Sequence, residues 1–434
     1  MTVPYRRIDD FLLSWKQSPR RMPLILQGAR QVGKTYSLLQ FGRKHYENTA
    51  YFNFETDPLL LSAFDDNIEP TRLVPLLSHL SRQTIVREKT LVIFDEIQLC
   101  ERALTSLKYF CEQEPGYHVA AAGSLLGVAV NRKRFSFPVG KVDIKTMYPL
   151  DMEEFLLAAG EGELAGDIRD SFQKEKALPA LLHRSALEYY RHYLLCGGMP
   201  ACVSAYLAEK DPVLLRHIQT LILESYLHDM SKYNTQNEIK KTRLVYDTVT
   251  VQLSRKNTRF QYKLVKSGGR AAEFENALEW LCLSGIIHRI YRAEVPRKPL
   301  ENYRDIDSFK TYVSDTGLLC AKKNLDSGDI LYPTAELDDF KGGMTENYAA
   351  LQLAFRGYTP CYWTSPRGAE VDFVIQREGN IIPVEVKAAD NTKAKSLEVY
   401  IETHKPRYAV KLSTRNFGFS EGKKTVPLYA AFCL

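Results

Sequence analysis

The sequence predicts an α/β fold with a parallel sheet in its N-terminal part and a second α/β region at its C-terminal end. Three observations predict this fold class. A short apolar run leads into a glycine-rich loop near residue 28, a longer apolar run ends in two acids near residue 95, and two strand-like runs form a hairpin between residues 371 and 387. Buried parallel strands give continuous apolar runs because helices cover both faces of their sheet.

The composition is that of an ordinary globular protein, with 45% hydrophobic and 25% charged residues among 434 and a formal net charge of +6. A chain of this length is expected to hold several domains. The first 18 residues follow a polar, amphipathic pattern that predicts a helical segment and differs from a signal sequence, and no apolar run approaches the length of a membrane span. We therefore expect a cytoplasmic protein that does not associate with a membrane.

The first motif is an apolar strand at residues 24–27 that runs into the pattern G-x-x-x-x-G-K-T. This pattern is typical of a loop that wraps a nucleotide phosphate, because its glycines let successive backbone N–H groups point inward. We expect Lys34 to reach the β- and γ-phosphates and the Thr35 hydroxyl to ligate Mg²⁺, with ATP as the nucleotide. The expected nucleotide contacts are Gly28, Ala29, Arg30, Gln31, Val32, Gly33, Lys34 and Thr35.

The second motif is the apolar run at residues 90–94 that ends in Asp95 and Glu96. Its position after a phosphate-binding loop favours a catalytic role over an ordinary acidic strand end, since ligands bind at the carboxyl ends of parallel strands. We expect Asp95 to hold Mg²⁺ and Glu96 to polarise the water that attacks the γ-phosphate. The sequence between the motifs has room for an additional strand, with residues 50–55 as the candidate, which favours a P-loop ATPase over a small GTPase.

A further apolar run at residues 117–123 predicts the next strand of the sheet, and Ser124 follows it. Ser124 is either a sensor of the γ-phosphate or part of a plain Gly-Ser turn. The basic loop that comes next carries Arg132, Arg134 and Lys141. Any of these cations is a candidate to stabilise the transferring phosphoryl group, in the same subunit or in a neighbouring one.

From residue 151 the pattern becomes helical and stays so to residue 235, which predicts a helical lid or connector with a break at residues 196–200. Residues 236–300 have the order of a winged-helix module, with helices near 240–253 and 271–284 and a strand at 285–292. The segment between the two helices has six cations and no acid, so it either contacts DNA or forms a solvated face. Its cations are Arg255, Lys256, Arg259, Lys263, Lys266 and Arg270.

The helix at 271–284 carries three acids, Glu273, Glu275 and Glu279. In winged helices the corresponding helix enters the major groove of DNA, where acids would be repelled by the phosphates. This argues for a structural or protein-contact role for that helix, and it leaves the basic segment as the candidate for nucleic-acid contact.

The C-terminal hairpin carries Asp372 on one strand and Glu385 and Lys387 on the other. Two turn positions are open, one that places Asp372 opposite Glu385 and one that places it opposite Lys387. Acids on neighbouring strands with a lysine two residues on are typical of metal-dependent nucleases, in which carboxylates hold Mg²⁺. Glu346, on a predicted helix, could add a fourth group. The alternative is a half-buried hairpin whose charges face water.

The whole chain resembles the prokaryotic AAA-type ATPases that carry a C-terminal domain of unknown function, numbered 4143. The resemblance covers nearly the full length and implies an AAA domain, a helical and winged-helix region and a fold similar to restriction endonucleases. It also implies phosphate binding by Gly33, Lys34 and Thr35, magnesium binding by Asp95 and catalysis by Glu96. The segments that carry it are residues 28–35, 91–98, 123–124, 137–141, 149–155, 197–200, 314–319 and 370–387.

One position departs from this family, because Lys141 follows Gly140 where many relatives have arginine. A lysine is a poorer planar clamp for a phosphoryl group, so Arg132 or Arg134 becomes the substitute. Sites of the AAA type often lie between subunits, which predicts a homo-oligomer, although the Lys141 substitution leaves a monomer or dimer open.

The sequence thus predicts five segments, namely an N-terminal helical segment (1–18), an ATPase domain (19–150), a helical lid (151–235), a winged-helix-like module (236–300) and a nuclease-like domain (301–434). We expect an ATP hydrolase that couples its nucleotide state to the C-terminal half, which acts on DNA. Two other functions stay open. One is a nucleotide-dependent switch that binds a protein partner and keeps the nuclease-like fold as an inactive scaffold, and the other is a transcription regulator.

Overall fold

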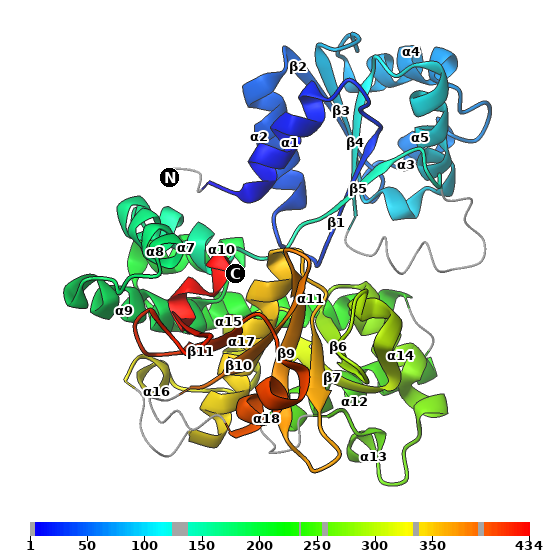
Figure 1. Cartoon of the computed structure of the whole chain (residues 1–434). Coiled ribbons are helices and arrows are strands. Elements are labelled where there is room, and N and C mark those ends of the chain that lie inside the picture. The colour runs from blue at the N-terminus through cyan, green and yellow to red at the C-terminus, as the bar shows by residue number, and fades with distance from the viewer. Residues whose placement is uncertain (1–4, 124–137, 234–235, 254–258, 333–337, 389–394) are drawn as a thin grey trace. The chain divides into compact units, whose positions relative to one another are not determined.

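The computed structural model describes residues 5–123, 138–233, 236–253, 259–332, 338–388 and 395–434. The described chain divides into two compact units. The N-terminal unit comprises residues 5–148 with the short segment 283–285, and the C-terminal unit comprises residues 149–282 and 286–434. Figure 1 shows the N-terminal unit in blue to cyan and the C-terminal unit in green to red.

The N-terminal unit is built on a five-stranded parallel sheet with the strand order β2-β3-β4-β1-β5. Its strands are β1 (Leu24–Gln27), β2 (Asn48–Asn53), β3 (Thr90–Asp95), β4 (His118–Gly123) and β5 (Asp143–Thr146). This confirms the predicted parallel sheet of a P-loop ATPase. The additional strand β2 lies at the edge beyond β3, whereas the strand that separates β1 from β3 is β4.

Helices cover both faces of this sheet, with α1 and α2 on one side and α3, α4 and α5 on the other (Figure 1). On the side of α3, α4 and α5, a cluster of aromatic rings fills the core. In it, Phe94 of β3 contacts Phe52, Phe54 and Phe64 at centroid distances of 5.8 to 6.0 Å. The helical elements are α1 (Arg7–Gln17), α2 (Lys34–His45), α3 (Pro58–Ser62), α4 (Pro70–Ser81), η1 (Ile97–Leu99) and α5 (Glu101–Gln113).

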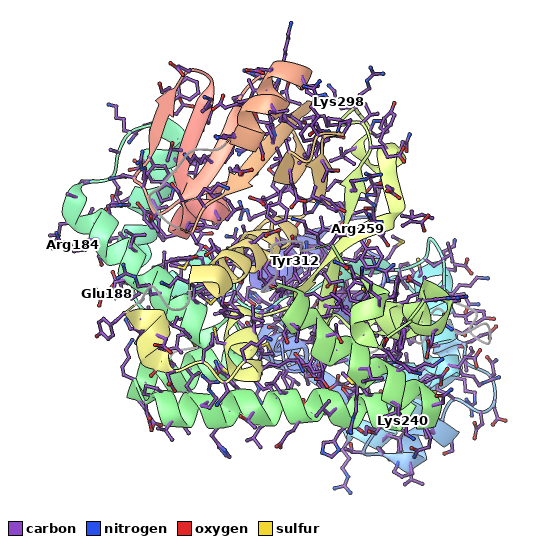
Figure 2. The ribbon with its side chains drawn as sticks, turned by 90° about the horizontal axis from the view of Figure 1, so that it is seen from below. Arg184, Glu188, Lys240, Arg259, Lys298 and Tyr312 are labelled. Atoms are coloured by element: carbon purple, nitrogen blue, oxygen red, sulfur yellow. The ribbon has the colours of Figure 1, made fainter. Side chains whose placement is uncertain are left out.

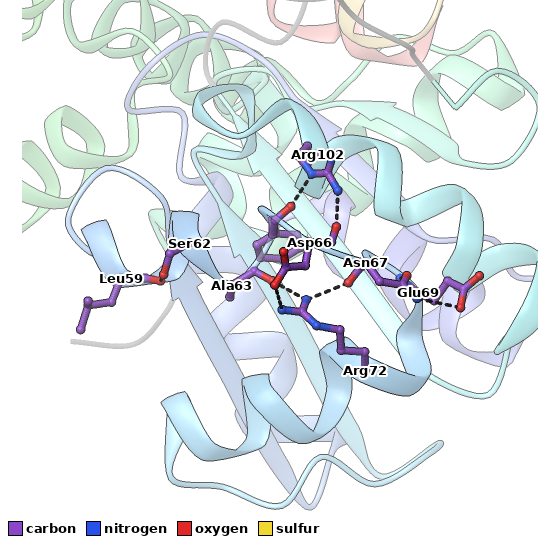
Figure 3. A network of polar contacts seen from close by, with 9 residues as sticks. Leu59, Ser62, Ala63, Asp66, Asn67, Glu69, Arg72 and Arg102 are labelled. Atoms are coloured by element: carbon purple, nitrogen blue, oxygen red, sulfur yellow. Dashed lines mark hydrogen bonds and ion pairs between the residues drawn. The ribbon is translucent and has the colours of Figure 1, made fainter.

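Two arginines hold the loop between α3 and α4 (Figure 3). Arg72 donates hydrogen bonds to the carbonyl oxygens of Ala63, at 3.0 Å, and Asn67, at 2.8 Å. It also forms an ion pair with Asp66 at 3.1 Å. Arg102 of α5 donates to two further carbonyl oxygens of the same loop, those of Phe64 and Asp66. The loop between α3 and α4 is therefore held by side chains from α4 and α5.

The C-terminal unit begins with helices, which confirms the predicted helical pattern after residue 151 and its break near residue 197. They are α7 (Met152–Ala158), α8 (Gly162–Lys174), α9 (Ala180–Cys196), α10 (Pro200–Glu209), α11 (Pro212–Tyr233), α12 (Gln236–Leu253), α13 (Tyr262–Val265) and α14 (Ala271–Leu283). Among the described residues no helix is long and apolar enough to cross a lipid bilayer.

An eight-stranded mixed sheet, with the order β12-β13-β11-β10-β9-β8-β6-β7, forms the rest of this unit. Its strands are β6 (Ile287–Ala293), β7 (Arg304–Val313), β8 (Cys361–Thr364), β9 (Glu370–Arg377), β10 (Asn380–Val386), β11 (Ala409–Ser413), β12 (Gly418–Ser420) and β13 (Lys423–Pro427). The helices between and after them are η2 (Leu300–Tyr303), α15 (Thr316–Lys322), α16 (Ser327–Leu331), α17 (Asp338–Phe355), α18 (Lys395–His404) and η4 (Leu428–Cys433).

The antiparallel pair β6 and β7 forms across residue 300, the predicted boundary between the winged-helix-like module and the nuclease-like domain. The two strands extend the sheet of β8 to β13 through the contact between Arg292 and Tyr362. The helices α12 and α14 and the strand β6 match the elements predicted for a winged helix. The division of the chain into five segments stays a prediction.

Three segments that carry the family resemblance meet in one contact, which we call the Asp315 latch (Leu150, Gly197, Gly198, Asp315 and Gly317). Gly198 donates its N–H to Asp315 Oδ2 at 2.6 Å and accepts a hydrogen bond from the Leu150 N–H at 2.7 Å. A Cβ atom on Gly198 would lie 2.0 Å from the Leu150 carbonyl oxygen, and one on Gly197 would lie 2.1 Å from Asp315 Oδ1. The glycines are therefore required by the close approach of three chain segments.

Candidate functional site

The glycine-rich loop joins the end of β1 to the start of α2 and packs against the chain that follows β5. Gly28 has a φ of 146° and Gly33 a φ of 97°, conformations that favour glycine, and Gln31 also has a positive φ, of 65°. A Cβ atom on Gly28 would lie 2.1 Å from the carbonyl oxygen of Met147. The conformation and the close packing both explain why glycine stands at this position.

Lys34 is buried inside this loop. Its Nζ donates hydrogen bonds to the carbonyl oxygens of Gly28 at 2.9 Å and of Ala29 at 2.8 Å. The loop therefore curls around the ammonium group, as the pattern predicts for a lysine that meets phosphate oxygens. Arg30 is partly buried and Gln31 is exposed, whereas Ala29 and Val32 are buried and fix the loop to the unit.

The first turn of α2, which follows the glycine-rich loop, contacts the acidic carboxyl end of β3. The Thr35 hydroxyl donates a hydrogen bond to Asp95 Oδ2 at 2.9 Å, and Tyr51 of β2 donates to the same oxygen at 2.7 Å. Hydroxyl and carboxylate oxygens are the ligands that Mg²⁺ prefers. The donor set of Thr35 and Asp95 therefore fits a magnesium ion that would also bind nucleotide phosphates.

Glu96 follows the strand in a left-handed conformation, with a φ of 50°, and its N–H donates a hydrogen bond to Asp95 Oδ1 at 3.1 Å. Gln98 donates a hydrogen bond to the Glu96 carboxylate. Burial raises the pKa of Glu96 and the neighbouring Asp95 adds to the effect, whereas Gln98 and Lys34 lower this pKa. A carboxylate with a raised pKa accepts a proton from water more readily, as a general base must.

The structure places only some of the predicted catalytic residues that follow β4. Ser124, Arg132 and Arg134 lie outside the described residues. Lys141 forms an ion pair with Glu112 at 3.0 Å and precedes β5, whose first residue pairs with the first residue of β1. Lys141 therefore lies near the amino ends of β5 and β1, whereas the glycine-rich loop follows the carboxyl end of β1.

Two residues of the site were not predicted. Arg6, which precedes α1, donates hydrogen bonds to the carbonyl oxygens of Val32 at 3.2 Å and Tyr148 at 2.7 Å, so it ties the glycine-rich loop to the end of the unit. Tyr51 contacts Asp95 from the neighbouring strand. No motif marks Arg6, but Tyr51 lies in the predicted strand at 50–55 and could have been found by assuming that this strand pairs with the one that carries Asp95.

The C-terminal hairpin brings the predicted acids together. Glu378 and Gly379 form its turn with φ values of 48° and 73°, and Val384 pairs with Phe373. This register places Glu385 opposite Asp372, which confirms the first of the two predicted alternatives. Glu346 lies on α17 as predicted.

The structure adds two charged residues to this group, Lys310 of β7 and Glu370 of β9. Lys310 Nζ lies 2.8 Å from Glu346 Oε1 and 2.7 Å from Glu370 Oε1, and Lys387 Nζ lies 2.6 Å from Glu385 Oε1. Tyr312 donates to Glu346 Oε1 at 2.7 Å. We call this group the acid–lysine cluster, and its charged members are Lys310, Glu346, Glu370, Asp372, Glu385 and Lys387.

The electrostatics of the cluster are those of crowded carboxylates. Burial raises the pKa of Asp372, and the charges of Glu385 and Glu346 raise it further. Burial also raises the pKa of Glu385, against the opposing effect of Lys387. In the described part of the chain, no group of three or more His, Cys, Asp or Glu side chains is arranged to hold a metal ion. The predicted acids are thus neighbours, but they do not form a metal-ligand set.

The basic segment lines a hollow of about 570 Å³ between α13 and the start of α14. Arg255 and Lys256 lie outside the described residues, and Lys266 faces Glu273 at 3.6 Å. Glu275 is engaged by Arg289 at 2.7 Å. The lining residues are Arg259, Phe260, Gln261, Tyr262, Lys263, Gly269, Arg270 and Ala271.

Comparisons with known proteins agree with this geometry. Residues 20–156 match the family described as a AAA domain. The N-terminal part of the chain is a AAA domain. Behind it, residues 187–329 match a domain of unknown function, DUF8612, and residues 341–431 match a second one, DUF4143. The predicted resemblance to AAA-type ATP-binding proteins with a DUF4143 region is thereby confirmed.

An uncharacterized protein of Methanocaldococcus jannaschii, MJ1544, is 22% identical over 400 residues, which are 87% of this chain and 77% of that protein. Among solved structures, the Aeropyrum pernix ORC1 protein in complex with DNA has 12% identity and a TM-score of 0.31, covering 74% of this chain and 92% of its own. The Drosophila ORC bound to DNA has 13% identity and a TM-score of 0.25, covering 76% and 87%. The assignment of the AAA domain rests on its strand order and its family match.

Proposed function

We propose that this AAA domain binds ATP with Mg²⁺ and hydrolyses it, in a cytoplasmic protein. The observation that carries the proposal is the hydrogen bond of 2.9 Å between Thr35 and Asp95, which joins the phosphate-binding loop to the strand end that presents Glu96. Two separate chain segments thus meet at the carboxyl ends of the strands. Such strand ends are where ligands bind in open parallel sheets.

Each group acts on a different part of the reaction. Lys34 stabilises negative charge on the β- and γ-phosphates, and backbone N–H groups of residues 28–33 surround those phosphates. Thr35 and Asp95 would hold Mg²⁺, and the bound ion would neutralise charge on the phosphates. Glu96 orients the attacking water and accepts its proton.

Phosphate release from the purified full-length chain tests this proposal. Lys34→Ala should remove both nucleotide binding and turnover, whereas Glu96→Gln should keep binding and slow turnover by about 10²- to 10⁴-fold, the usual contribution of a general base. Glu88→Gln is the matched control, because Glu88 is an exposed acid of the same unit that precedes β3, whereas Glu96 follows that strand. Turnover that survives both Lys34→Ala and Glu96→Gln would remove the assignment.

We further propose that the nucleotide state is coupled to a C-terminal half that binds DNA. The support is the hollow lined by Arg259, Lys263 and Arg270, whose lining contains no acid. Each cation that contacts a phosphate adds about 0.9 to the salt dependence of DNA binding. Replacing all three by glutamine should therefore lower that slope by about 2.7, as measured in salt titrations with duplex DNA in the presence and absence of ATP.

A triple variant of exposed lysines elsewhere in the same unit, Lys176, Lys395 and Lys405, is the control for the loss of charge alone. An equal effect of both triple variants would contradict a specific role of the hollow. Uniform affinity across random duplexes would count against the regulator hypothesis, because a regulator must select a sequence.

The alternative function is a nucleotide-dependent switch that binds a protein partner, with the nuclease-like fold as an inactive scaffold. The ion pairs within the acid–lysine cluster support one part of this alternative, namely that the nuclease-like fold does not cleave DNA. It predicts DNA binding that is weak and insensitive to salt. The position of Lys141 supports a homo-oligomer in which one subunit completes the site of the next.

A further inference from the structure

We propose that Lys310 takes the place of a divalent metal ion in the acid–lysine cluster, so that an internal ammonium group holds the carboxylates together and the C-terminal domain does not cut DNA. This inference rests on the proposed nuclease-like character of the hairpin that carries Asp372 and Glu385.

The first argument is where Lys310 comes from. It lies on β7, a strand that reaches the cluster from outside the hairpin, and its side chain is only 1% exposed. The backbone of Arg259 forms an isolated β-bridge with Lys310, and Phe260 donates its N–H to the carbonyl oxygen of Phe309 at 2.8 Å. Figure 2 labels Arg259, the bridge partner of Lys310, and Tyr312, a later residue of β7. The lysine is therefore held in place from its backbone as well as from its side chain.

The second argument is what the ammonium group contacts. Lys310 Nζ lies within 2.8 Å of oxygens from Glu346 on α17 and Glu370 on β9, and it lies 5.2 Å from the centre of the Tyr362 ring. Carboxylate oxygens from two different elements are the surroundings that a metal ion would have. Although burial lowers the pKa of Lys310, the charges of Glu346, Glu370 and Asp372 outweigh it and raise this pKa. The group therefore stays a cation at neutral pH.

The third argument is the charge balance of the cluster. Lys387 neutralises Glu385 through Oε1, and Lys310 neutralises Glu346, which also accepts the Tyr312 hydroxyl. The side chain of Glu370 is 39% exposed, so water solvates part of its charge. Burial and the nearby Glu385 and Glu346 raise the pKa of Asp372, whose Oδ2 accepts a hydrogen bond from the Val386 N–H at 2.7 Å. A divalent ion would instead lie beside a buried ammonium group of like charge.

One atom identifies where a metal ion could bind if Lys310 were removed. Glu385 Oε2 is buried and has no hydrogen-bond partner among the described residues, and Asp372 lies opposite Glu385 in the hairpin register. Replacing Lys310 by methionine keeps the length and apolar character of the stem and removes the cation. The freed oxygens of Glu346 would then join Asp372 and Glu385 as ligands for a hard ion.

Binding of Mn²⁺ to the nucleotide-free, full-length chain, followed by electron paramagnetic resonance, tests the proposal. Any Mn²⁺ that the wild type binds should still be bound when Asp372→Asn is introduced. Lys310→Met should gain about one equivalent of Mn²⁺ per chain, and the double variant with Asp372→Asn should lose it. Lys322→Met is the control, because Lys322 is a partly buried lysine in a single ion pair with Asp247 at 2.5 Å; it should gain no Mn²⁺.

Two results would overturn the proposal. One is a working metal site in the wild type, seen either as Mn²⁺ binding that Asp372→Asn abolishes or as plasmid cleavage that Asp372→Ala abolishes. The other is a folded Lys310→Met chain, judged by circular dichroism, that gains no Mn²⁺. If Lys310→Met does not fold, the wild-type measurements still decide. Phosphate release measured on the same samples separates this outcome from a failure of the proposed ATPase, because that reaction depends on Lys34 and Glu96.

Discussion

Asp315 makes the stability of the C-terminal unit depend on pH in an unusual direction. This carboxyl group is 1% exposed and accepts hydrogen bonds from the Gly198 and Leu318 N–H groups, at 2.6 and 2.8 Å. Burial raises its pKa from 3.8 to about 6, even though those hydrogen bonds lower it. The folded unit therefore binds a proton at this site more tightly than the unfolded chain does.

The magnitude follows from the difference between the two pKa values. A difference of about 2.2 units, from 3.8 to about 6, corresponds to about 3 kcal/mol at 1.36 kcal/mol per unit. Because the folded pKa is the higher one, this contribution is complete below pH 3.8 and is lost as the pH rises through 6. The free energy of unfolding of the C-terminal unit should thus fall by about 2 kcal/mol from this group alone between pH 4 and 7, because the carboxyl group of the unfolded chain is already partly ionised at pH 4.

Urea unfolding at a series of pH values measures this change. In a Trp15→Phe background the remaining tryptophans, Trp280 and Trp363, lie in the C-terminal unit, so fluorescence reports on that unit. Subtracting the profile of Asp315→Asn cancels the other titrating groups, because asparagine is neutral throughout. A difference between the two proteins that stays constant from pH 4 to 7 would refute the reasoning.

Three further predictions concern the AAA domain. Gly28→Ala should prevent the N-terminal unit from folding normally, since its Cβ would lie 2.1 Å from a backbone oxygen; a native melting temperature in thermal unfolding would contradict this. Tyr51→Phe removes a hydrogen bond of 2.7 Å to Asp95 and should weaken Mg²⁺-dependent ATP binding about tenfold in calorimetry, with unchanged affinity as the opposing result. Lys141→Ala should keep ATP binding and lose turnover, and mixing it with Lys34→Ala should restore phosphate release if the lysine acts on a neighbouring subunit; no restoration would count against that role.

The sequence was most informative where the chemistry is local. The glycine-rich loop, the strand that ends at Asp95 and the turn at Glu378 each depend on neighbouring residues, and the structure contains all three elements as expected. The hairpin register was left open between two alternatives, because the turn could begin at either of two positions. The positive φ values of Glu378 and Gly379 resolve it.

Features that depend on distant contacts could not be predicted. The position of β4 between β1 and β3 depends on how the helices that connect the strands pack. This packing cannot be read from any one segment of the sequence. Lys310 and Arg6 belong to no motif, and each reaches its partners from a part of the chain far away in sequence. Lys141 was considered for its charge, but only the pairing of β5 with β1 shows at which edge of the sheet it lies.

The Asp315 latch bears on how the two units can be produced as separate fragments. Arg6 of the first unit binds the carbonyl oxygen of Tyr148, while the amide of Leu150 is already committed to Gly198 in the second. A fragment that begins at residue 151 would lack Leu150, whose side chain is fully buried. The carbonyl oxygen of Gly198 would then lose the Leu150 N–H that donates to it. Cleavage between residues 148 and 149 preserves both attachments, so expression of either half should start from that single peptide bond.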